Sequence, residues 1–334
     1  MSSVTIRRCH CLKTVIKSSL SLAQRANNCP ENRSVVQHKY IYNCDINMSA
    51  ELENLPTNAR SLDFYGLDAS SIPNSSKELL TTYAGIPPEE INQHVDTIRE
   101  KAFRIFPYPC IGMYRFLNLG LPQSPVYEEV LERVRKGETF LDLGCCFGQE
   151  IRNLIVEGAR PENCYGSDLR QEFIDLGFDL FQDRDRQGSK INWLVGNIFD
   201  DDSSLSSIKN QISIIYTGSF FHLFNWEEQF DIAKRVVSLL KPEPGVLICG
   251  RQVGNENPGL YTSSGYTGER QRYRHNIKSW TEFWDEVGEA TGTNWKVDAE
   301  LNPFGGGFGS SEQKLVNFRR EDGAKILKFV IRRV

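Results

Sequence analysis

The stretch Phe140-Leu-Asp-Leu-Gly-Cys-Cys-Phe-Gly-Gln-Glu150 indicates the fold class of this chain. It begins as an apolar run typical of a strand that is buried on both faces in a parallel sheet. Gly144 and Gly148 interrupt the run, and apolar residues then recur at helical spacing from Gln149 onward. A strand, a glycine turn and a helix N-terminus in succession form the first half of a nucleotide-binding unit, because small residues let a ligand approach the backbone.

Asp142 narrows the choice of ligand, because it lies inside the strand end, two residues before the first glycine. A buried carboxylate costs free energy unless something pairs with it, and a cationic ligand would be such a partner. The pyrophosphate of a dinucleotide would be repelled. The third glycine of G-x-G-x-x-G is also absent, since Gln149-Glu150-Ile151 follows Gly148. A nicotinamide oxidoreductase would share the doubly wound sheet, but these features count against it.

At this point the sequence resembles the class I S-adenosylmethionine-dependent methyltransferases, whose first motif reads roughly apolar-Asp-apolar-Gly-x-Gly-x-Gly. Cys146 occupies the place of the middle glycine, so the loop must accommodate a small thiol side chain. The resemblance implies an α/β fold with a doubly wound, mostly parallel seven-stranded sheet and an N-terminal helical cap. It also implies S-adenosyl-L-methionine as the cofactor, held in part by Asp142, Gly144, Cys145 and Gly148.

Residues at later strand ends would complete the cofactor site. A strand predicted over 163–168 ends in Asp168, where dinucleotide and methyltransferase folds place a carboxylate for the ribose hydroxyls. A helix N-cap is the other role that we consider for Asp168. After a strand over 191–195, the resemblance places Asn197 against the adenine amine and Ile198 over the ring, with an ordinary turn as the alternative. The other expected cofactor contacts are Leu169, Ser219 and Phe220.

His222 is the candidate catalytic residue. It follows a fourth predicted strand over 212–216, on the side where the transferred methyl group is expected. There it could orient a carboxylate or deprotonate a hydroxyl. A neutral histidine that holds the loop through a backbone hydrogen bond is the alternative. The expected substrate contacts are Phe221, Trp226, Arg274 and His275, although for Arg274 and His275 we favour plain solvation at the surface.

Four runs narrow the resemblance further: Tyr108-Pro-Cys-Ile, the Phe140 stretch, Ser219-Phe-Phe-His-Leu-Phe-Asn-Trp226 and Arg274-His-Asn. They are similar to fungal methyltransferases of meroterpenoid and related secondary-metabolite pathways. This resemblance implies methylation of a free carboxyl group, or sometimes a hydroxyl, on a polycyclic natural product, often by a homodimer. The alternatives are a phenol methyltransferase of a polyketide and, from another class, a methyltransferase-fold binding protein without activity, as would follow if Cys146 blocked the loop.

The rest of the chain fits one such domain. We predict a helical cap over 48–125 and a methyltransferase domain over 126–334. The cap has a helix starting near Pro87 and an apolar run over 106–119, which is a cover for the core or a lid over the ligand. Further expected elements are a helix over 125–137, a helix after Asn225 with a capping box, a strand over 245–250, a functional loop over 254–274, a helix over 279–289, two antiparallel strands over 295–299 and 325–331, and a glycine loop over 305–309.

Residues 1–47 differ in charge, with seven basic and two acidic residues against 32 basic and 41 acidic in the remainder. We interpret them as a disordered extension, or as a gene model begun too far upstream. A chain starting at Met48 is then expected to fold and methylate equally well. A mitochondrial transit peptide is the alternative. The acidic remainder argues against a nucleic-acid substrate, because it offers no basic stripe for phosphates.

Length and cysteine usage complete the expectations. The 334 residues suffice for one large α/β domain with additions. No apolar run approaches the roughly 20 residues that a membrane-spanning helix needs, so we expect a cytoplasmic protein without a membrane partner. The nine cysteines show no metal-ligand spacing, and we therefore expect reduced thiols and no bound metal.

Overall fold

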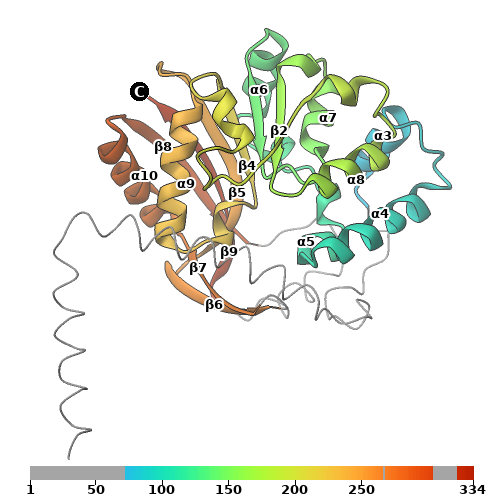
Figure 1. The fold of residues 1–334 in the computed structure, drawn as a ribbon. Coiled ribbons are helices and arrows are strands. Elements are labelled where there is room, and N and C mark those ends of the chain that lie inside the picture. The colour runs from blue at the N-terminus through green and yellow to red at the C-terminus, as the bar shows by residue number, and fades with distance from the viewer. Residues whose placement is uncertain (1–71, 266–267, 304–321) are drawn as a thin grey trace, which may run out of the picture. The chain divides into compact units, whose positions relative to one another are not determined.

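A seven-stranded sheet in the order β3-β2-β1-β4-β5-β9-β8 forms the centre of the protein (Figure 1). The computed structural model describes residues 72–265, 268–303 and 322–334, so the predictions for 1–47 and 305–309 lie outside the described residues. The strands are β1 (Phe140–Leu143), β2 (Cys164–Asp168), β3 (Asn192–Val195), β4 (Ile214–Gly218), β5 (Leu247–Asn255), β8 (Trp295–Asn302) and β9 (Ala324–Arg333).

The first five strands are parallel, and β9 runs antiparallel between β5 and β8. This arrangement confirms the predicted fold class. The predicted strands all occur, each starting within two residues of its expected position. Because β1 lies between β2 and β4, the residues that follow these three strands meet at one edge of the sheet.

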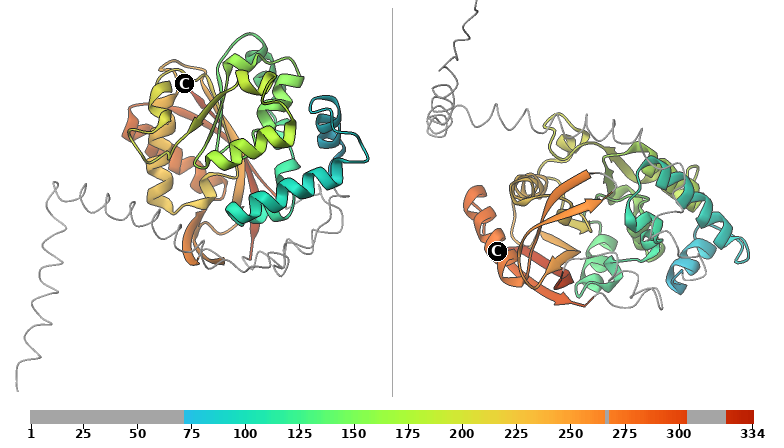
Figure 2. Two further views of the ribbon diagram at one scale, coloured as in Figure 1. Left: turned by 45° about the vertical axis from the view of Figure 1, so that its right-hand side comes forward. Right: turned by 90° about the horizontal axis from the view of Figure 1, so that it is seen from below.

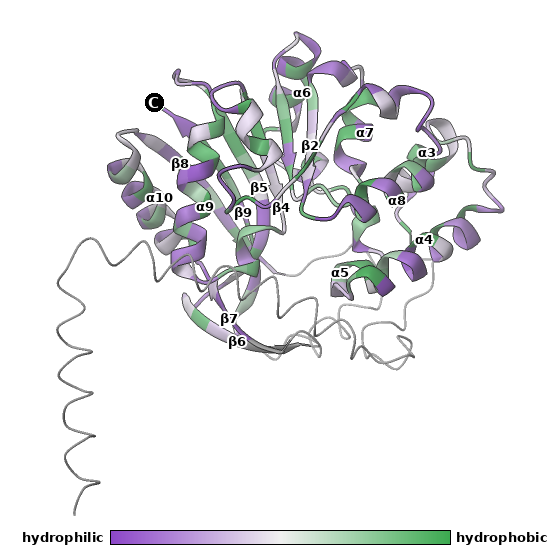
Figure 3. Cartoon of the chain, viewed as in Figure 1, coloured by the Kyte–Doolittle hydropathy of each residue, from purple (hydrophilic) through white to green (hydrophobic). Residues whose placement is uncertain are grey.

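Helices cover both faces of the sheet (Figures 1 and 2). On one face, α6 (Tyr127–Arg135), α7 (Gln149–Val156) and α8 (Gln171–Phe181) pack on residues such as Phe140 and Trp193. On the other face, α9 (Trp226–Leu239) and α10 (Ile277–Thr291) pack on residues such as Leu141. The strands therefore supply apolar side chains to both faces, and the hydropathy pattern in Figure 3 shows polar residues on the outer sides of the helices.

Local signals define the two helices of the second face. Asn225 accepts a hydrogen bond from the Glu228 N–H, and the Glu228 carboxylate accepts one from the Asn225 N–H, which confirms the predicted capping box of α9. In α10, the four predicted core residues are fully buried: Trp280, Phe283, Trp284 and Val287.

The described part of the predicted cap contains α3 (Asn74–Thr82), α4 (Ile91–Ile105), α5 (Pro109–Gly112) and the short 3-10 helices η5 (Arg115–Leu117) and η6 (Leu121–Gln123). Helix α4 packs against α8. The apolar run over 106–119 is mostly buried, as its composition predicts. Further 3-10 helices are η7 (Pro161–Asn163), η8 (Gln187–Lys190), η9 (Ser204–Ile208) and η10 (Phe221–Leu223).

The predicted loop over 254–274 is wrong. Strand β5 continues to Asn255, because β9 pairs with it along its whole length. The following residues form an antiparallel hairpin of β6 (Gly259–Gly265) and β7 (Gly268–Arg274), which is a separate two-stranded sheet (Figure 1). Because the hairpin is not part of the central sheet, neither of its strands needs an apolar face toward the core. Its sequence therefore lacks the apolar alternation by which a strand is usually recognised.

Among the described residues, no helix combines the length and the apolar character that crossing a membrane would require.

Candidate functional site

The loop after β1 forms a tight turn against β2. The N–H groups of Gly144 and Cys145 both donate to the Ser167 carbonyl, at 2.8 and 2.9 Å. Gly148 has a φ of +66° and directly precedes α7. A side chain at Gly148 would collide with the Trp193 ring and would lie 2.9 Å from Arg152 Nη1. Glycine is therefore required at Gly148 both for its backbone conformation and for the lack of space.

Cys146 adopts the left-handed conformation with a φ of +52°, a backbone conformation that glycine adopts with less strain than other residues. Its N–H donates to Asp168 Oδ2 at 2.9 Å, so the loop keeps its link to the end of β2. Burial raises the pKa of the Cys146 thiol well above its ordinary value, and the side chain stays neutral. The loop thus accommodates the thiol.

Asp142 carries a buried oxygen without a partner. Its side chain is 2% exposed, and Oδ2 has no hydrogen-bond donor among the described residues. Burial, followed by the charges of Glu150 and Asp168, raises the pKa of Asp142 well above its usual range. A cation or a hydrogen-bond donor at this place would relieve that cost.

Asp168 lies at the end of β2, next to the loop. Besides the Cys146 N–H, it accepts the Arg170 N–H through Oδ1 at 3.0 Å. Burial raises its pKa, and these backbone hydrogen bonds oppose the shift. The N-cap of α8 is Arg170, so the helix-cap alternative for Asp168 does not hold. Leu169 is 45% exposed beside it and is available to a ligand.

We expect Asp168→Ala to leave the fold intact and to weaken cofactor binding by about 1.5–3 kcal/mol, the range for a hydrogen bond to a charged group. Calorimetric titration with S-adenosylhomocysteine measures the effect. Asp185→Ala is the matched control, since Asp185 is an exposed aspartate in the segment that follows α8. An unchanged dissociation constant in a folded Asp168→Ala variant would remove Asp168 from the site.

The end of β3 lies beside Asp168, whose carbonyl accepts the Gly196 N–H at 3.1 Å. Asn197 Oδ1 accepts the Phe199 N–H at 3.1 Å, which leaves its second lone pair for an amine. Ile198 is 8% exposed and belongs to the core, so most of its surface is already covered.

The end of β4 approaches the same loop. Ser219 has a φ of +59°, and its N–H donates to the Arg251 carbonyl at 2.7 Å. The Phe220 ring lies against Gly144, where an added side-chain carbon would be 2.7 Å from Phe220 Cδ2. The structure thus brings Asp142, Gly144, Cys145, Gly148, Asp168, Asn197, Ser219 and Phe220 to one edge of the sheet.

His222 lies in η10 and is half-buried. Its carbonyl accepts a hydrogen bond from Arg274 Nη1 at 2.6 Å. Arg274 is only 3% exposed, so the interpretation of Arg274 as a solvated surface residue is wrong. The reason is the β6–β7 hairpin, which ends at Arg274 and docks there: the Tyr273 N–H donates to the Phe224 carbonyl at 2.9 Å.

His275 is also buried rather than solvated, at 0% exposure. Its ring lies 4.9 Å from Trp280 and 5.2 Å from Phe283, and Nδ1 is 3.1 Å from Ser279 Oγ. Burial lowers the pKa of His275 to about 3, and the imidazole is therefore neutral. Trp226 is half-buried and packs on the His275 ring at 5.4 Å.

Phe221 is likewise fully buried, and its ring packs on Trp280 at 5.4 Å. Neither Phe221 nor His275 has any surface that a substrate could touch in this structure. We therefore assign these two expected substrate contacts to core packing.

Glu150 connects the cap to α7, a role that was not predicted from the sequence. Glu150 is 3% exposed, and its two oxygens accept the N–H groups of Gly120 at 2.6 Å and Leu121 at 3.1 Å. Burial raises the pKa of Glu150, and the two N–H groups oppose that shift. A charged residue at the start of a short apolar helix was the available signal.

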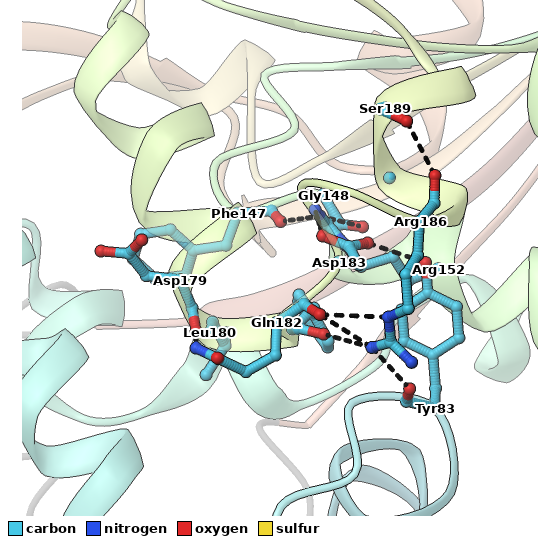
Figure 4. Close-up of polar contacts among 12 residues, drawn as sticks. Tyr83, Phe147, Gly148, Arg152, Asp179, Leu180, Gln182, Asp183, Arg186 and Ser189 are labelled. Atoms are coloured by element: carbon cyan, nitrogen blue, oxygen red, sulfur yellow. Dashed lines mark hydrogen bonds and ion pairs between the residues drawn. The ribbon is translucent and has the colours of Figure 1, made fainter.

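A buried ion pair was missed as well (Figure 4). Arg152 of α7 and Asp183 are both 0% exposed and form two hydrogen bonds, of 2.7 and 2.9 Å. Asp183 also accepts the Tyr83 hydroxyl at 2.7 Å, and Arg152 Nη1 donates to the Phe147 carbonyl at 2.6 Å. The pair therefore connects the cap, α7 and the loop after β1.

No group of three or more His, Cys, Asp or Glu side chains suited to a metal ion occurs in the part of the chain that the structure describes.

Comparison with known proteins identifies relatives of this chain. A model of the meroterpenoid methyltransferase N-terminal domain matches residues 64–117. O-methyltransferase phiE of a fungal species (strain ATCC 74256) is 44% identical over 223 residues, which are 66% of this chain and 73% of the relative. Asnovolin E/Chermesin D methyltransferase nvfJ of Aspergillus novofumigatus is 42% identical over 246 residues, 73% and 86% of the two chains. O-methyltransferase atr3 of Stereocaulon alpinum is 41% identical over 262 residues, 77% and 73%.

Proposed function

Because the chain belongs to the S-adenosylmethionine-dependent methyltransferases of fungal meroterpenoid and related secondary metabolism, we propose that it methylates a carboxyl group of a polycyclic terpenoid or meroterpenoid. The observation that carries the proposal is an aromatic cluster beside His222. The ring centroid of Phe224 lies 5.6 Å from that of Phe199 and 5.5 Å from that of Phe220, and all three rings are only partly buried. Such a wall suits the apolar body of a terpenoid acceptor.

The residues at the loop fit the cofactor. The unpartnered Asp142 Oδ2 would accept a hydrogen bond from its ammonium group, and Asp168 would accept the ribose hydroxyls through its remaining lone pairs. When bound, S-adenosylmethionine supplies a methyl carbon on a positively charged sulfur, which an oxygen displaces in line. The protein contributes positioning and the exclusion of water.

His222 need not act as a base in this proposal. A carboxylate is ionised near neutral pH, whereas a phenol with a pKa near 10 benefits from a base. Arg274 Nη1 donates to the His222 backbone carbonyl and so holds the turn that carries this histidine. In the proposal, the imidazole orients the acceptor.

We expect His222→Gln to reduce turnover by on the order of tenfold, from lost positioning. With a hydroxyl acceptor, the same change would cost about 10²–10⁴-fold, and activity would recover at high pH. The pH–rate profile of the variant distinguishes these cases. His94→Gln serves as the control, because His94 contacts the Leu180 carbonyl at 2.9 Å, within the contact between α4 and α8. A collapse of turnover that only high pH relieves would contradict carboxyl methylation.

Product chemistry tests the acceptor directly. The full chain is incubated with S-adenosylmethionine and with asnovolin E, chermesin D, abietic acid or abietinol, the alcohol that corresponds to abietic acid. We expect methylation of a carboxylic acid and release of methanol when the product is treated with alkali, because esters hydrolyse and ethers do not. An alkali-stable methyl ether would replace the proposal with hydroxyl methylation.

A further inference from the structure

Two arginines from distant parts of the chain meet beside the site. Arg251 lies on β5 opposite Gly218, the last residue of β4. Its Nη2 donates to the Asn118 carbonyl at 2.9 Å. The Asn118 N–H in turn donates to the carbonyl of Arg115, at 3.0 Å, so the Arg251 head group contacts the turn that carries Arg115. We refer to Arg115 and Arg251 as the arginine pair.

Gly120 permits this approach. An added side-chain carbon at Gly120 would collide with the Tyr216 hydroxyl and would lie 2.6 Å from Arg251 Nε. Tyr216 is on β4, opposite Asp142 of β1. The arginine pair therefore lies near the carboxyl end of β4. Strand β4 is the neighbour of β1, which carries the unpartnered Asp142.

The arginine pair lacks a nearby counter-charge. Among the described residues, no carboxylate oxygen lies within 4.0 Å of either guanidinium. Burial raises the pKa of Glu150, and the charge of Arg251 acts to lower it. The two oxygens of Glu150, however, already accept hydrogen bonds from the N–H groups of Gly120 and Leu121. Asp142, which pairs with Tyr216 across β1 and β4, has a pKa that burial raises.

The pKa of Arg115 reflects this lack of a counter-charge. Burial and then the charge of Arg251 lower its pKa to about 10, although arginine normally holds its proton far more firmly. Its guanidinium makes no hydrogen bond to any described residue. Two cations are thus held together in a half-buried place where only an anion would balance them.

We propose that the arginine pair binds a carboxylate, because guanidinium groups match the two oxygens of that group with paired N–H donors. Two sources share this chemistry: the methionyl carboxylate of the cofactor and the carboxylate of the acceptor. The second source rests on the proposed function. In that case, methyl transfer forms an O–CH3 bond, the C–S electron pair goes to sulfur, and the charge that the arginine pair recognises disappears in the neutral ester.

The cofactor source is tested by binding alone. Calorimetry compares the affinity of the full chain for S-adenosylhomocysteine with its affinity for the decarboxylated analogue, 5′-S-(3-aminopropyl)-5′-thioadenosine. If the pair holds the methionyl carboxylate, Arg115→Gln raises the dissociation constant of S-adenosylhomocysteine about 10-fold to 100-fold and leaves that of the decarboxylated analogue unchanged. Arg115→Lys, which keeps the charge, should recover part of the loss.

The acceptor source is tested by turnover. If the pair holds the acceptor, Arg115→Gln leaves the affinity for S-adenosylhomocysteine unchanged and raises KM for the acid about 10-fold to 100-fold. It also leaves inhibition by the corresponding methyl ester unchanged. If no acid is methylated, the proposed function fails and the acceptor source fails with it, while the cofactor measurement still decides the proposal.

Arg104→Gln is the matched control, because Arg104 is exposed on α4 and is expected to change none of these values. Arg251→Lys gives a second, independent variant that keeps a donor for the Asn118 carbonyl. Its effect should fall on the same ligand as that of Arg115→Gln. The proposal is overturned if both variants fold and bind S-adenosylhomocysteine, the decarboxylated analogue and the acid within twofold of the unaltered chain.

Discussion

Replacing Asp183 by alanine is expected to lower the free energy of unfolding by about 3–5 kcal/mol. The change leaves the fully buried Arg152 guanidinium without its carboxylate, between the Phe181 ring at 4.6 Å and the Trp193 ring at 5.1 Å. Aromatic faces compensate only a small part of the cost of a buried charge. Urea denaturation of the two chains measures the difference.

Asp179→Ala is the matched control for this prediction, because Asp179 is an exposed aspartate of α8 whose ion pair with Lys101, at 3.7 Å, lies in solvent. We expect it to cost less than about 1 kcal/mol. The double variant Arg152→Met/Asp183→Ala should regain much of the lost stability, since it removes the unpaired charge. If the double variant is no more stable than Asp183→Ala, the unpaired charge of Arg152 is not the cause of the lost stability.

The same variant should also affect the cofactor loop. Arg152 holds the Phe147 carbonyl, and Asp183 holds the Tyr83 hydroxyl of the cap. Asp183→Ala therefore removes the contact with the cap and takes away the carboxylate that orients the arginine bound to the loop. Weaker binding of S-adenosylhomocysteine by the folded fraction of Asp183→Ala, compared with Asp179→Ala, would show this connection.

Acidification is expected to destabilise the protein through His275, by about 3 kcal/mol between pH 6.5 and pH 4. Burial lowers its pKa in the folded state to about 3, from the ordinary value of 6.5. Between these values the unfolded chain binds a proton that the folded chain does not. The contribution of His275 is therefore complete above pH 6.5 and is lost progressively as the pH falls toward 3.

His275→Asn isolates this contribution. Asparagine does not titrate, and its amide nitrogen takes the place of Nδ1 opposite the Ser279 hydroxyl. Buried acids such as Asp142 and Glu150, whose pKa values are raised, add stability as the pH falls. Because both chains contain these acids, their contribution cancels in the difference between the two unfolding free energies. The difference in unfolding free energy between the chains should shrink by about 3 kcal/mol from pH 6.5 to pH 4. A constant difference would show that His275 accepts a proton in the folded state.

Much of the sheet edge at which we propose that the cofactor binds could be predicted, because it depends on local order. The apolar run, Gly144 and Gly148 specify a strand, a turn and a helix within eleven residues, and the structure has β1 and α7 there. Asp168 follows from the end of the next strand. The segment over 254–274 was predicted less well, since this Gly/Tyr/Arg-rich stretch was interpreted as a loop and instead forms the β6–β7 hairpin.

Short-range signals in the sequence specify the succession of the central strands and their helices and the residues at the strand ends, because periodicity, glycine and capping signals act over a few neighbouring positions. Which polar residues are buried, and with what partner, follows from long-range packing. Arg152 meets Asp183, Arg251 meets the Asn118 carbonyl, and Arg274 meets the His222 carbonyl, across separations of 31, 133 and 52 positions. A charge far along the chain is invisible to any local pattern, and yet in a buried place it is the partner that sets the free energy of the group.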